Sequence, residues 1–215
     1  MMTRGGRLAL IVSAVVFVSG ACGAPEGTSG RSSPGPSFWS LINRLAVDYE
    51  YHDTLEALWG DSDVAVIGHM KNVREGRGLG GKKGQDVTTE SVIVTFQVDE
   101  VVRGQLNPDS RRIVDLELRR PSLVSVNELD DATPDDRMLL LIYDQAGTLP
   151  NVEIDESGAE RDPGKTLYAL TTHKALFIEH DGGLTTPLNT TPGPFEESFD
   201  ARTIDELAQE IRGFE

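Results

Sequence analysis

Cysteine is almost absent from this sequence of 215 residues, because Cys22 is the only one. A single thiol cannot close a disulfide within the chain, so the fold must be held together by its core alone. If Cys22 is itself modified, no thiolate remains to act as a nucleophile or as a metal ligand. The sequence therefore excludes a disulfide scaffold and a cysteine-based active site.

Long apolar runs are also lacking. The uncharged stretch Leu8–Val18 has eleven residues, and a helix of this length spans about 16 Å. A bilayer core of about 30 Å needs about twenty residues, so a transmembrane helix is not expected.

Positive charge is scarce, with 20 Lys and Arg against 35 Asp and Glu. Without residues 1–21, which contain two arginines and no acid, the formal charge is −17. This surface disfavours nucleic acid and anionic lipid as partners, and it would tolerate divalent cations or a basic protein surface.

Linear catalytic motifs are missing as well. The sequence has no GxSxG, and its histidines show no HExxH spacing. His173 and His180 are seven residues apart around a predicted strand, which places them on opposite faces. Ser62, in Gly60-Asp61-Ser62-Asp63, fits a turn between a helix and a strand. We therefore predict neither an enzyme nor a cofactor.

The N-terminus has the three-part layout of a secretory signal. Arginines precede the apolar run, and small residues lead up to Cys22. Val18–Cys22 resembles the lipobox of bacterial lipoproteins, although Ser19 stands where leucine is commonest. The resemblance implies a signal peptide over residues 1–21, cleavage between Ala21 and Cys22, and a diacylglyceryl group on the Cys22 sulfur. The expected location is the extracytoplasmic face of the cell membrane; the alternative is a plain secreted protein.

The next residues predict a tether followed by one domain. Gly23–Ser37 consists almost entirely of Gly, Pro, Ser, Ala and Thr, which favours a flexible chain with a root-mean-square reach of about 22 Å. We assign residues 22–37 to the lipidated cysteine and tether. Residues 38–215 have the length of a single globular domain.

Hydrophobic periodicity predicts short strands flanked by helices. Helical spacing begins at Phe38 and continues to Tyr49, a second helix covers Asp53–Trp59 with Asp53 as its cap, and Thr203 and Glu206 form the capping box of a last helix. Strands are predicted at residues 64–68, 91–102, 113–119, 138–143, 167–170, 175–180 and 184–187, the last two joined by a hairpin at Asp181-Gly182-Gly183. In the third strand, Asp115, Glu117 and Arg119 are expected to face solvent.

These elements predict a mainly β domain, either a small antiparallel barrel or a sandwich, with N-terminal and C-terminal helices. Ser62–Gly68, Phe96–Gly104 and Leu139–Leu141 resemble the first strands of netrin-like domains, the superfamily of the tissue inhibitors of metalloproteinases. The resemblance covers Asp61 to Tyr143 and implies an oligonucleotide/oligosaccharide-binding (OB) barrel. Netrin-like domains carry several disulfides, which this chain cannot form. A lipidated Cys22 could not coordinate a protease metal, so inhibition is not carried over.

A glycine-rich segment imitates nucleotide-binding loops. Gly76, Gly78 and Gly81 match a dinucleotide fingerprint, and Gly76–Lys82 nearly matches a phosphate-binding loop. Both motifs open a helix, whereas here a β run follows. A hairpin loop without nucleotide is the better interpretation.

Two acidic segments could hold calcium, which takes six to eight oxygen ligands. One contains Asp130, Asp131, Asp135 and Asp136; the other contains Asp155, Glu156, Glu160 and Asp162. Neither fits the twelve-residue calcium loop, so solvated turns are favoured.

The function expected is a non-catalytic binding module with an envelope protein as partner. The alternatives are an envelope hydrolase with paired carboxylates and a small-ligand-binding lipoprotein.

Overall fold

The computed structural model describes residues 37–42, 52–80, 87–145, 153–155, 159, 165–180, 183–188, 194–199 and 201–215. All of them belong to one compact unit, Pro34–Glu215. The helices are α1 (Phe38–Ile42), α2 (Leu55–Gly60), the 3-10 turn η2 (Pro108–Ser110), α3 (Val126–Asp131), α4 (Pro194–Glu197) and α5 (Ile204–Gly213). The strands are β1 (Val64–Gly80), β2 (Val87–Gly104), β3 (Ile113–Arg120), β4 (Met138–Asp144), β5 (Glu153–Asp155), β6 (Leu167–Leu170), β7 (Leu176–His180) and β8 (Gly183–Thr185).

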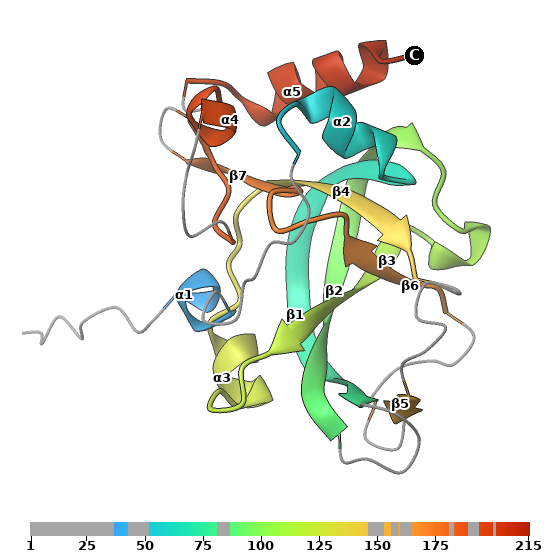
Figure 1. The fold of residues 1–215 in the computed structure, drawn as a ribbon, viewed down its shortest axis with the longest axis vertical. Helices are drawn as coiled ribbons and strands as arrows, with labels where there is room; N and C mark the ends of the chain where they lie inside the picture. The colour runs from blue at the N-terminus through green and yellow to red at the C-terminus, as the bar shows by residue number, and fades with distance from the viewer. Residues whose placement is uncertain are drawn as a thin grey trace, which may run out of the picture. The chain divides into compact units, whose positions relative to one another are not determined.

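Five strands close into a ring. β1 pairs with β2, β2 with β3, β3 with β6 and β6 with β4, and β4 returns to pair with β1 over Val64–Gly68. Only the β3–β6 pair in this ring is parallel. β5 adds to the far end of β1, and β7 and β8 continue from β4 (Figure 1). The predicted mainly β class is confirmed, and the closed ring is the five-stranded barrel expected of an OB fold rather than a sandwich.

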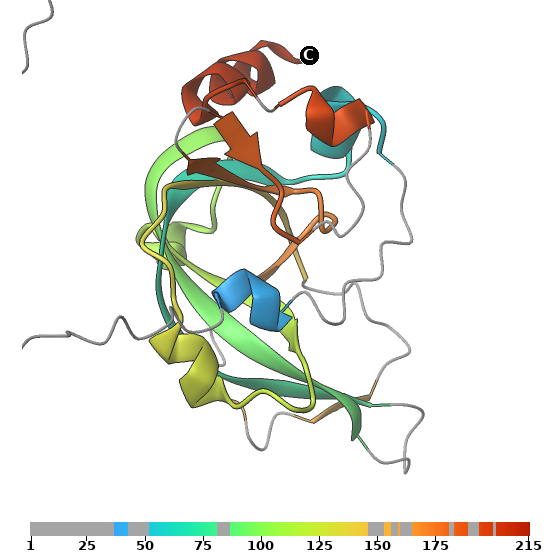
Figure 2. The ribbon, with the colours of Figure 1, turned by 90° about the vertical axis from the view of Figure 1, so that its left-hand side faces the viewer.

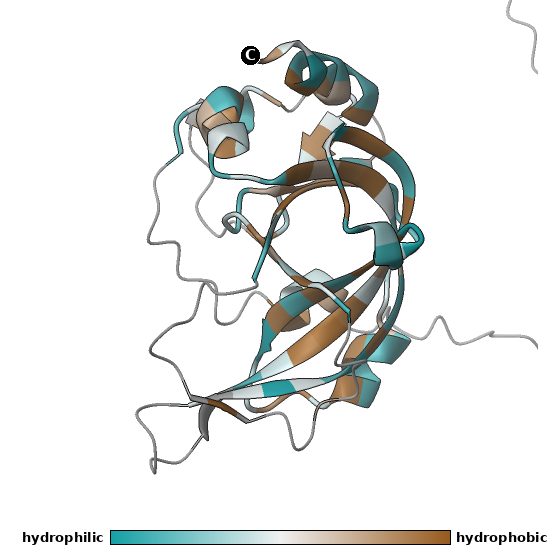
Figure 3. Cartoon of the chain, turned by 90° about the vertical axis from the view of Figure 1, so that its right-hand side faces the viewer, coloured by the Kyte–Doolittle hydropathy of each residue, from teal (hydrophilic) through white to brown (hydrophobic). Residues whose placement is uncertain are grey.

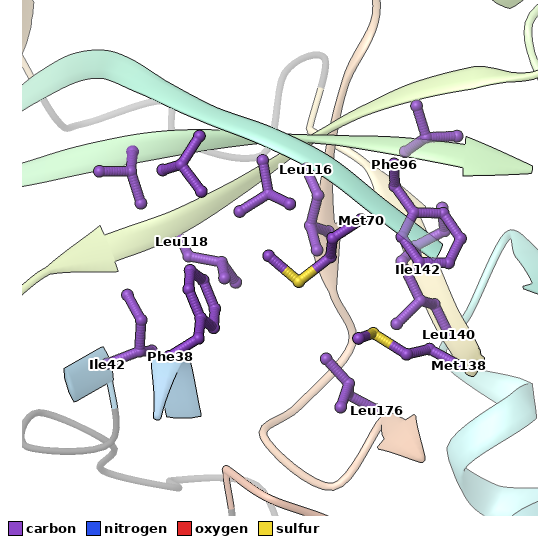
Figure 4. Close-up of a cluster of buried hydrophobic side chains, with 14 of the residues drawn as sticks. Phe38, Ile42, Met70, Phe96, Leu116, Leu118, Met138, Leu140, Ile142 and Leu176 are labelled. Atoms are coloured by element: carbon purple, nitrogen blue, oxygen red, sulfur yellow. The ribbon is translucent and has the colours of Figure 1, made fainter. Parts of the chain in front are cut away.

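The barrel buries apolar side chains on both of its surfaces. Alternate residues of β4 point to opposite sides. Met138, Leu140 and Ile142 fill the interior with side chains from the other strands (Figure 4). Leu139 and Leu141 face outward into a second cluster, which the helices α2, α4 and α5 cover. This double burial explains why the sequence of β4 is apolar throughout.

One end of the barrel is covered by two short helices, α1 and α3 (Figures 1 and 2). Phe38 and Ile42 of α1 lie beside Leu118 of β3 (Figure 4), and Leu129 of α3 joins the same buried cluster. Asp130 Oδ1 accepts a 2.7 Å hydrogen bond from Val73 N, which fixes α3 against β1. The first residues after the predicted tether are thus part of the barrel core.

The C-terminal helix is built as the sequence predicts. Thr203 and Glu206 form the capping box, and Ile204, Leu207 and Ile211 are buried. Figure 3 shows the apolar face of α5 turned toward the strands and its polar face turned away. Arg103 of β2 donates to the carbonyl oxygen of Ile211 at 2.9 Å and to that of Phe214. This cation completes the helix end, where carbonyl groups lack partners.

Several predicted boundaries were wrong. β1 continues to Gly80 and β2 begins at Val87, so Gly76–Gly80 form strand rather than loop. The N-cap of α2 is Thr54, whose side chain accepts from Ala57 N, and not Asp53. The helix α3, with its capping box of Ser125 and Glu128, was not predicted. No helix in the described part of the chain is both long and apolar enough to cross a bilayer.

Candidate binding site at the β2–β3 turn

The turn between β2 and β3 is fastened to β6 through one asparagine. Asn107 Oδ1 accepts a 3.0 Å hydrogen bond from Asp109 N and thereby starts the 3-10 turn η2. The Asn107 backbone N donates to the Tyr168 hydroxyl at 3.0 Å, and Asn107 Nδ2 donates to Thr166 Oγ1 at 2.7 Å. The turn therefore has a fixed position at the end of the barrel.

Two successive arginines in this turn adopt left-handed backbone angles. Arg111 has φ 47° and Arg112 has φ 64°, a conformation that costs roughly 1–2 kcal/mol for a residue with a Cβ. The surroundings hold it in place. The Arg112 carbonyl oxygen accepts from Val98 N at 2.8 Å and from Gln97 Nε2 at 3.2 Å. Such over-determined strain is concentrated at functional sites in proteins.

A shallow pocket lies beside the turn. It has room for about one water molecule and is otherwise open to solvent. The side chains that line it are polar apart from one isoleucine, but carbon atoms make up most of its exposed surface. The lining residues are Asn107, Asp109, Ser110, Ile113, Asp115, Lys165 and Thr166. Hydroxyl, amide and carboxylate groups thus face one depression together with one cation and one apolar side chain.

The innermost acid of this pocket is buried in an ion pair. Asp115 is 4% exposed, and its Oδ2 lies 2.6 Å from Arg74 Nη2. Neither carboxylate oxygen of Asp115 accepts a well-aligned hydrogen bond, so the contact is ionic rather than a directed bond. Arg74 also donates to Thr95 of β2. The prediction that Asp115 faces solvent was wrong, because Arg74 reaches it across β2.

A second buried ion pair lies farther along the same outer face. Arg77 donates to Glu117 through Nε to Oε1 and through Nη2 to Oε2, each at 2.9 Å. Ser91 Oγ donates to Glu117 Oε1 at 2.8 Å and lies 2.9 Å from the Arg77 carbonyl oxygen. Arg77 Nη2 also donates to Gln145 at 2.7 Å. Glu117, predicted to be solvated, is 6% exposed because these donors enclose it.

The glycine-rich segment allows β2 to approach β1 closely beside this ion pair. A Cβ on Gly76 would lie 2.7 Å from the Ser91 carbonyl carbon and 2.8 Å from its oxygen, distances that real Cβ atoms do not reach. Gly76 is therefore required by the close approach of β2. Gly76 and Gly78 belong to a strand and begin no helix, so the helix on which a phosphate-binding loop depends does not start there. Gly81 and Lys82 lie outside the described residues.

The predicted calcium ligands lie apart from this site. Asp130 and Asp131 end α3, and Asp135 and Asp136 follow it; Asp130 uses its Oδ1 to hold Val73 N. Among the residues that the structure describes, no three His, Cys, Asp or Glu side chains come together as a metal site. Ala21, Cys22, Glu156, Glu160 and Asp162 lie outside the described residues.

Two of the histidines and Ser62 have local partners. His52 Nε2 lies 2.8 Å from Asp61, and His69 Nδ1 lies 3.1 Å from Asp99. Ser62 Oγ donates to the Leu58 carbonyl oxygen at 2.7 Å and lies 2.7 Å from Thr171 Oγ1. Ser62 therefore fills the turn position that the sequence indicated.

No family model, curated protein or solved structure matches this chain. The role of the β2–β3 turn therefore has to be inferred from its geometry. Sequence reasoning did not find this site, although one signal was present. Asn107-Pro108 is a dipeptide that marks turns, but nothing in the side chains of Arg111 and Arg112 indicates a left-handed backbone.

Proposed function

We propose that this chain is an exported lipoprotein, anchored by lipid on Cys22 at the extracytoplasmic face of the cell membrane, and that its barrel is a non-catalytic binding module. The binding site is the β2–β3 turn with its adjoining pocket, and the partner is an envelope protein. The observation that carries the proposal is the pair of left-handed residues Arg111 and Arg112 beside the shallow pocket. Their strain costs stability and yet is held by hydrogen bonds from β2.

The composition of the pocket supports a polar protein surface as ligand. Asp109, Ser110 and Lys165 offer donors and acceptors of both charges, and Ile113, 37% exposed, offers one apolar contact. OB barrels bind ligands with the face of their second and third strands and with the loops that follow their first and fourth strands. Ile113 of β3, and Lys165 and Thr166 at the end of the connection from β4 to β6, belong to these positions. The formal charge of −17 expected of the processed chain disfavours nucleic acid at this position.

A hydrolase with paired carboxylates is the alternative closest to the same pocket, because Asp109 and Asp115 both line it. The geometry gives this alternative little support. Both oxygens of Asp115 are buried, and Arg74 lies 2.6 Å from one of them, so a substrate could not reach this acid without displacing the arginine. A small-ligand carrier would need a deep apolar pocket, and side chains fill the barrel interior (Figure 4).

The lipid anchor is tested first. Intact-mass measurement of the protein extracted from membranes should show a chain that begins at Cys22 and carries a diacylglyceryl group. A Cys22→Ala variant should leave the membrane fraction. A membrane-free wild-type chain that retains residues 1–21 would overturn the anchor and leave the binding site untouched.

The binding site is tested by placing a photoreactive amino acid at Asp109, with a matched control at Glu210 on the exposed side of α5. Irradiation of native membranes should join one recurrent envelope protein to position 109 and not to position 210. The purified partner should give the same crosslink, and Ile113→Glu should abolish it. Equal crosslinking at both positions, or none with abundant protein, would refute the proposal.

A further inference from the structure

Leu123 is the most exposed of the large apolar residues that stand out at the described surface. It is 88% exposed, whereas Val101, Ile113 and Ile154 are 36–39% exposed. Single exposed apolar side chains are normal on soluble proteins, so exposure alone assigns no role to Leu123. The position of Leu123 in the fold indicates one.

Leu123 lies at the apex of a rigid turn. Val124 N donates to the Pro121 carbonyl oxygen at 3.0 Å, which closes the turn around Leu123. Val124 is buried in the barrel core, and the capping box of Ser125 and Glu128 fixes the start of α3 directly afterwards. Because both sides of the turn are held, little chain entropy is lost when Leu123 makes a contact.

The turn leads into α3, at the end of the barrel that α1 also covers (Figures 1 and 2). The predicted tether ends at Ser37, directly before α1. A flexible chain of the length predicted from the sequence has a reach of about 22 Å, so the proposed lipid on Cys22 would keep the α1–α3 end close to the membrane. Short flexible linkers give effective concentrations in the millimolar range. A contact too weak to recruit a free protein can therefore orient a tethered one.

We infer that Leu123 inserts into the surface of the bilayer that carries the lipid anchor, and that this contact orients the barrel. The inference rests on the proposed lipidation of Cys22. Full burial of a leucine side chain favours the docked orientation by roughly tenfold to a hundredfold. β3 runs from Ile113 to Arg120 and spans about 26 Å. Docking at the α3 end therefore presents the β2–β3 turn away from the membrane.

The charges near this end select the lipid. The helix α3 carries Glu128, Asp130 and Asp131, and Asp135 and Asp136 follow it; these five acids outnumber Arg119 and Arg120, which end β3 just before the turn. Carboxylates beside an anionic bilayer repel it, and their field falls off within a Debye length. Docking should thus be strong on zwitterionic phosphatidylcholine, which has no net charge, and weaker when anionic phosphatidylglycerol is added.

The experiment uses the full lipidated protein in vesicles. Acylation blocks the sulfur of Cys22, so Leu123→Cys supplies the only thiol for a polarity-sensitive fluorophore. Gln105→Cys, exposed at the opposite end of β3, is the matched control. On phosphatidylcholine vesicles the label at position 123 should brighten several-fold, shift to the blue, and be quenched by doxyl-labelled lipid. The label at position 105 should show none of these changes.

Each other outcome has a distinct meaning. Co-flotation with vesicles but no lipid quenching at position 123 would overturn the docking while the anchor stands. Equal quenching at both positions would do the same, since it would indicate an unoriented barrel. Failure of the protein to float, or labelling of Cys22 itself, would overturn the lipidation on which the inference depends. A blue shift without lipid quenching would indicate contact with protein and would also refute insertion.

Discussion

Arg77 and Glu117 are joined by two parallel N–H···O bonds of 2.9 Å on the outer face of the barrel, where both side chains are less than a tenth exposed. A bidentate pair of this kind has good geometry. Burial nevertheless removes both charges from water, and that penalty can equal or exceed their attraction. The pair therefore fixes β1 relative to β3 without necessarily adding to stability.

Removing one partner of this pair should be costly. Arg77→Ala leaves Glu117 buried without its main donor, and we expect a loss of about 3–5 kcal/mol in the free energy of unfolding. The double variant Arg77→Met with Glu117→Leu should be about as stable as the wild type, or more so. Urea unfolding measures both.

The exposed pair of Arg212 and Glu100 supplies the control. Arg212→Ala should cost less than about 1 kcal/mol, because water screens this pair. A loss for Arg77→Ala as small as the loss for Arg212→Ala would contradict the buried network.

Much of the barrel could be predicted from sequence because local patterns determine it. β3 alternates cleanly, β4 is apolar on both faces, and Thr203 with Glu206 marks the start of α5. The far half of β1 could not be predicted. Its pairing with β2 shifts register at several points, including Glu75/Gly78, and each shift breaks the alternation on which strand prediction depends.

The buried charges were missed for a different reason. Asp115 and Glu117 look solvated in their own strand, and only pairing through β2 brings Arg74 and Arg77 against them. These partners are about forty residues away in the sequence. The binding site escaped prediction in the same way. It combines Asn107 of one turn with Thr166 beside β6, and its strain lies in backbone angles.

The left-handed backbone at Arg111 should lower the stability of the fold while it supports binding. Arg111→Gly relieves a strain of about 1–2 kcal/mol and adds about 0.5–1 kcal/mol of unfolded-chain entropy, so thermal unfolding should show a small net gain. The same variant should weaken the crosslink from position 109, because the turn becomes less rigid. A gain in stability with unchanged crosslinking would separate the strain from the binding site.

Gly104 provides the reverse control for that prediction. It has φ +79°, and a Cβ there would overlap the Asp63 carbonyl oxygen. Gly104→Ala should therefore lower the free energy of unfolding by about 1–3 kcal/mol. An increase in the free energy of unfolding for Arg111→Gly and a decrease for Gly104→Ala would confirm that both backbone positions favour glycine.

Tyr168 should give the stability a dependence on alkaline pH. Burial raises the pKa of Tyr168 above its ordinary value; the hydrogen bond from Asn107 lowers it in part, and the charges of Asp144 and Asp63 raise it. The folded protein thus holds the phenolic proton more tightly than the unfolded chain. The stability that the neutral Tyr168 side chain gives the folded protein is complete below about pH 10. It is lost as the pH rises through the folded-state pKa.

Tyr168→Phe tests this dependence by urea unfolding between neutral and alkaline pH. At neutral pH the variant should be less stable by about 1 kcal/mol, because Asn107 N loses its acceptor. Above about pH 10 the difference should shrink, since phenylalanine has no proton to lose. A difference that stays constant with pH would show that Tyr168 does not titrate in this way.

The requirement for glycine at position 76 separates a structural role from phosphate binding. Gly76→Ala places its Cβ against the Ser91 backbone, so the strands must separate and the bonds from Ser91 and Arg77 to Glu117 must weaken. We expect a loss of about 1–3 kcal/mol, measured by urea unfolding without any nucleotide. Ser91→Ala should rescue this loss only in part, because the carbonyl carbon and oxygen of Ser91 remain in the way.

Gly60 supplies the control. It ends α2, and no atom lies within 4 Å of a Cβ added there. Gly60→Ala should therefore be neutral or stabilising by up to about 1 kcal/mol. Equal effects at positions 60 and 76 would mean that β2 does not approach Gly76 closely, and the glycine-rich segment would then need another explanation.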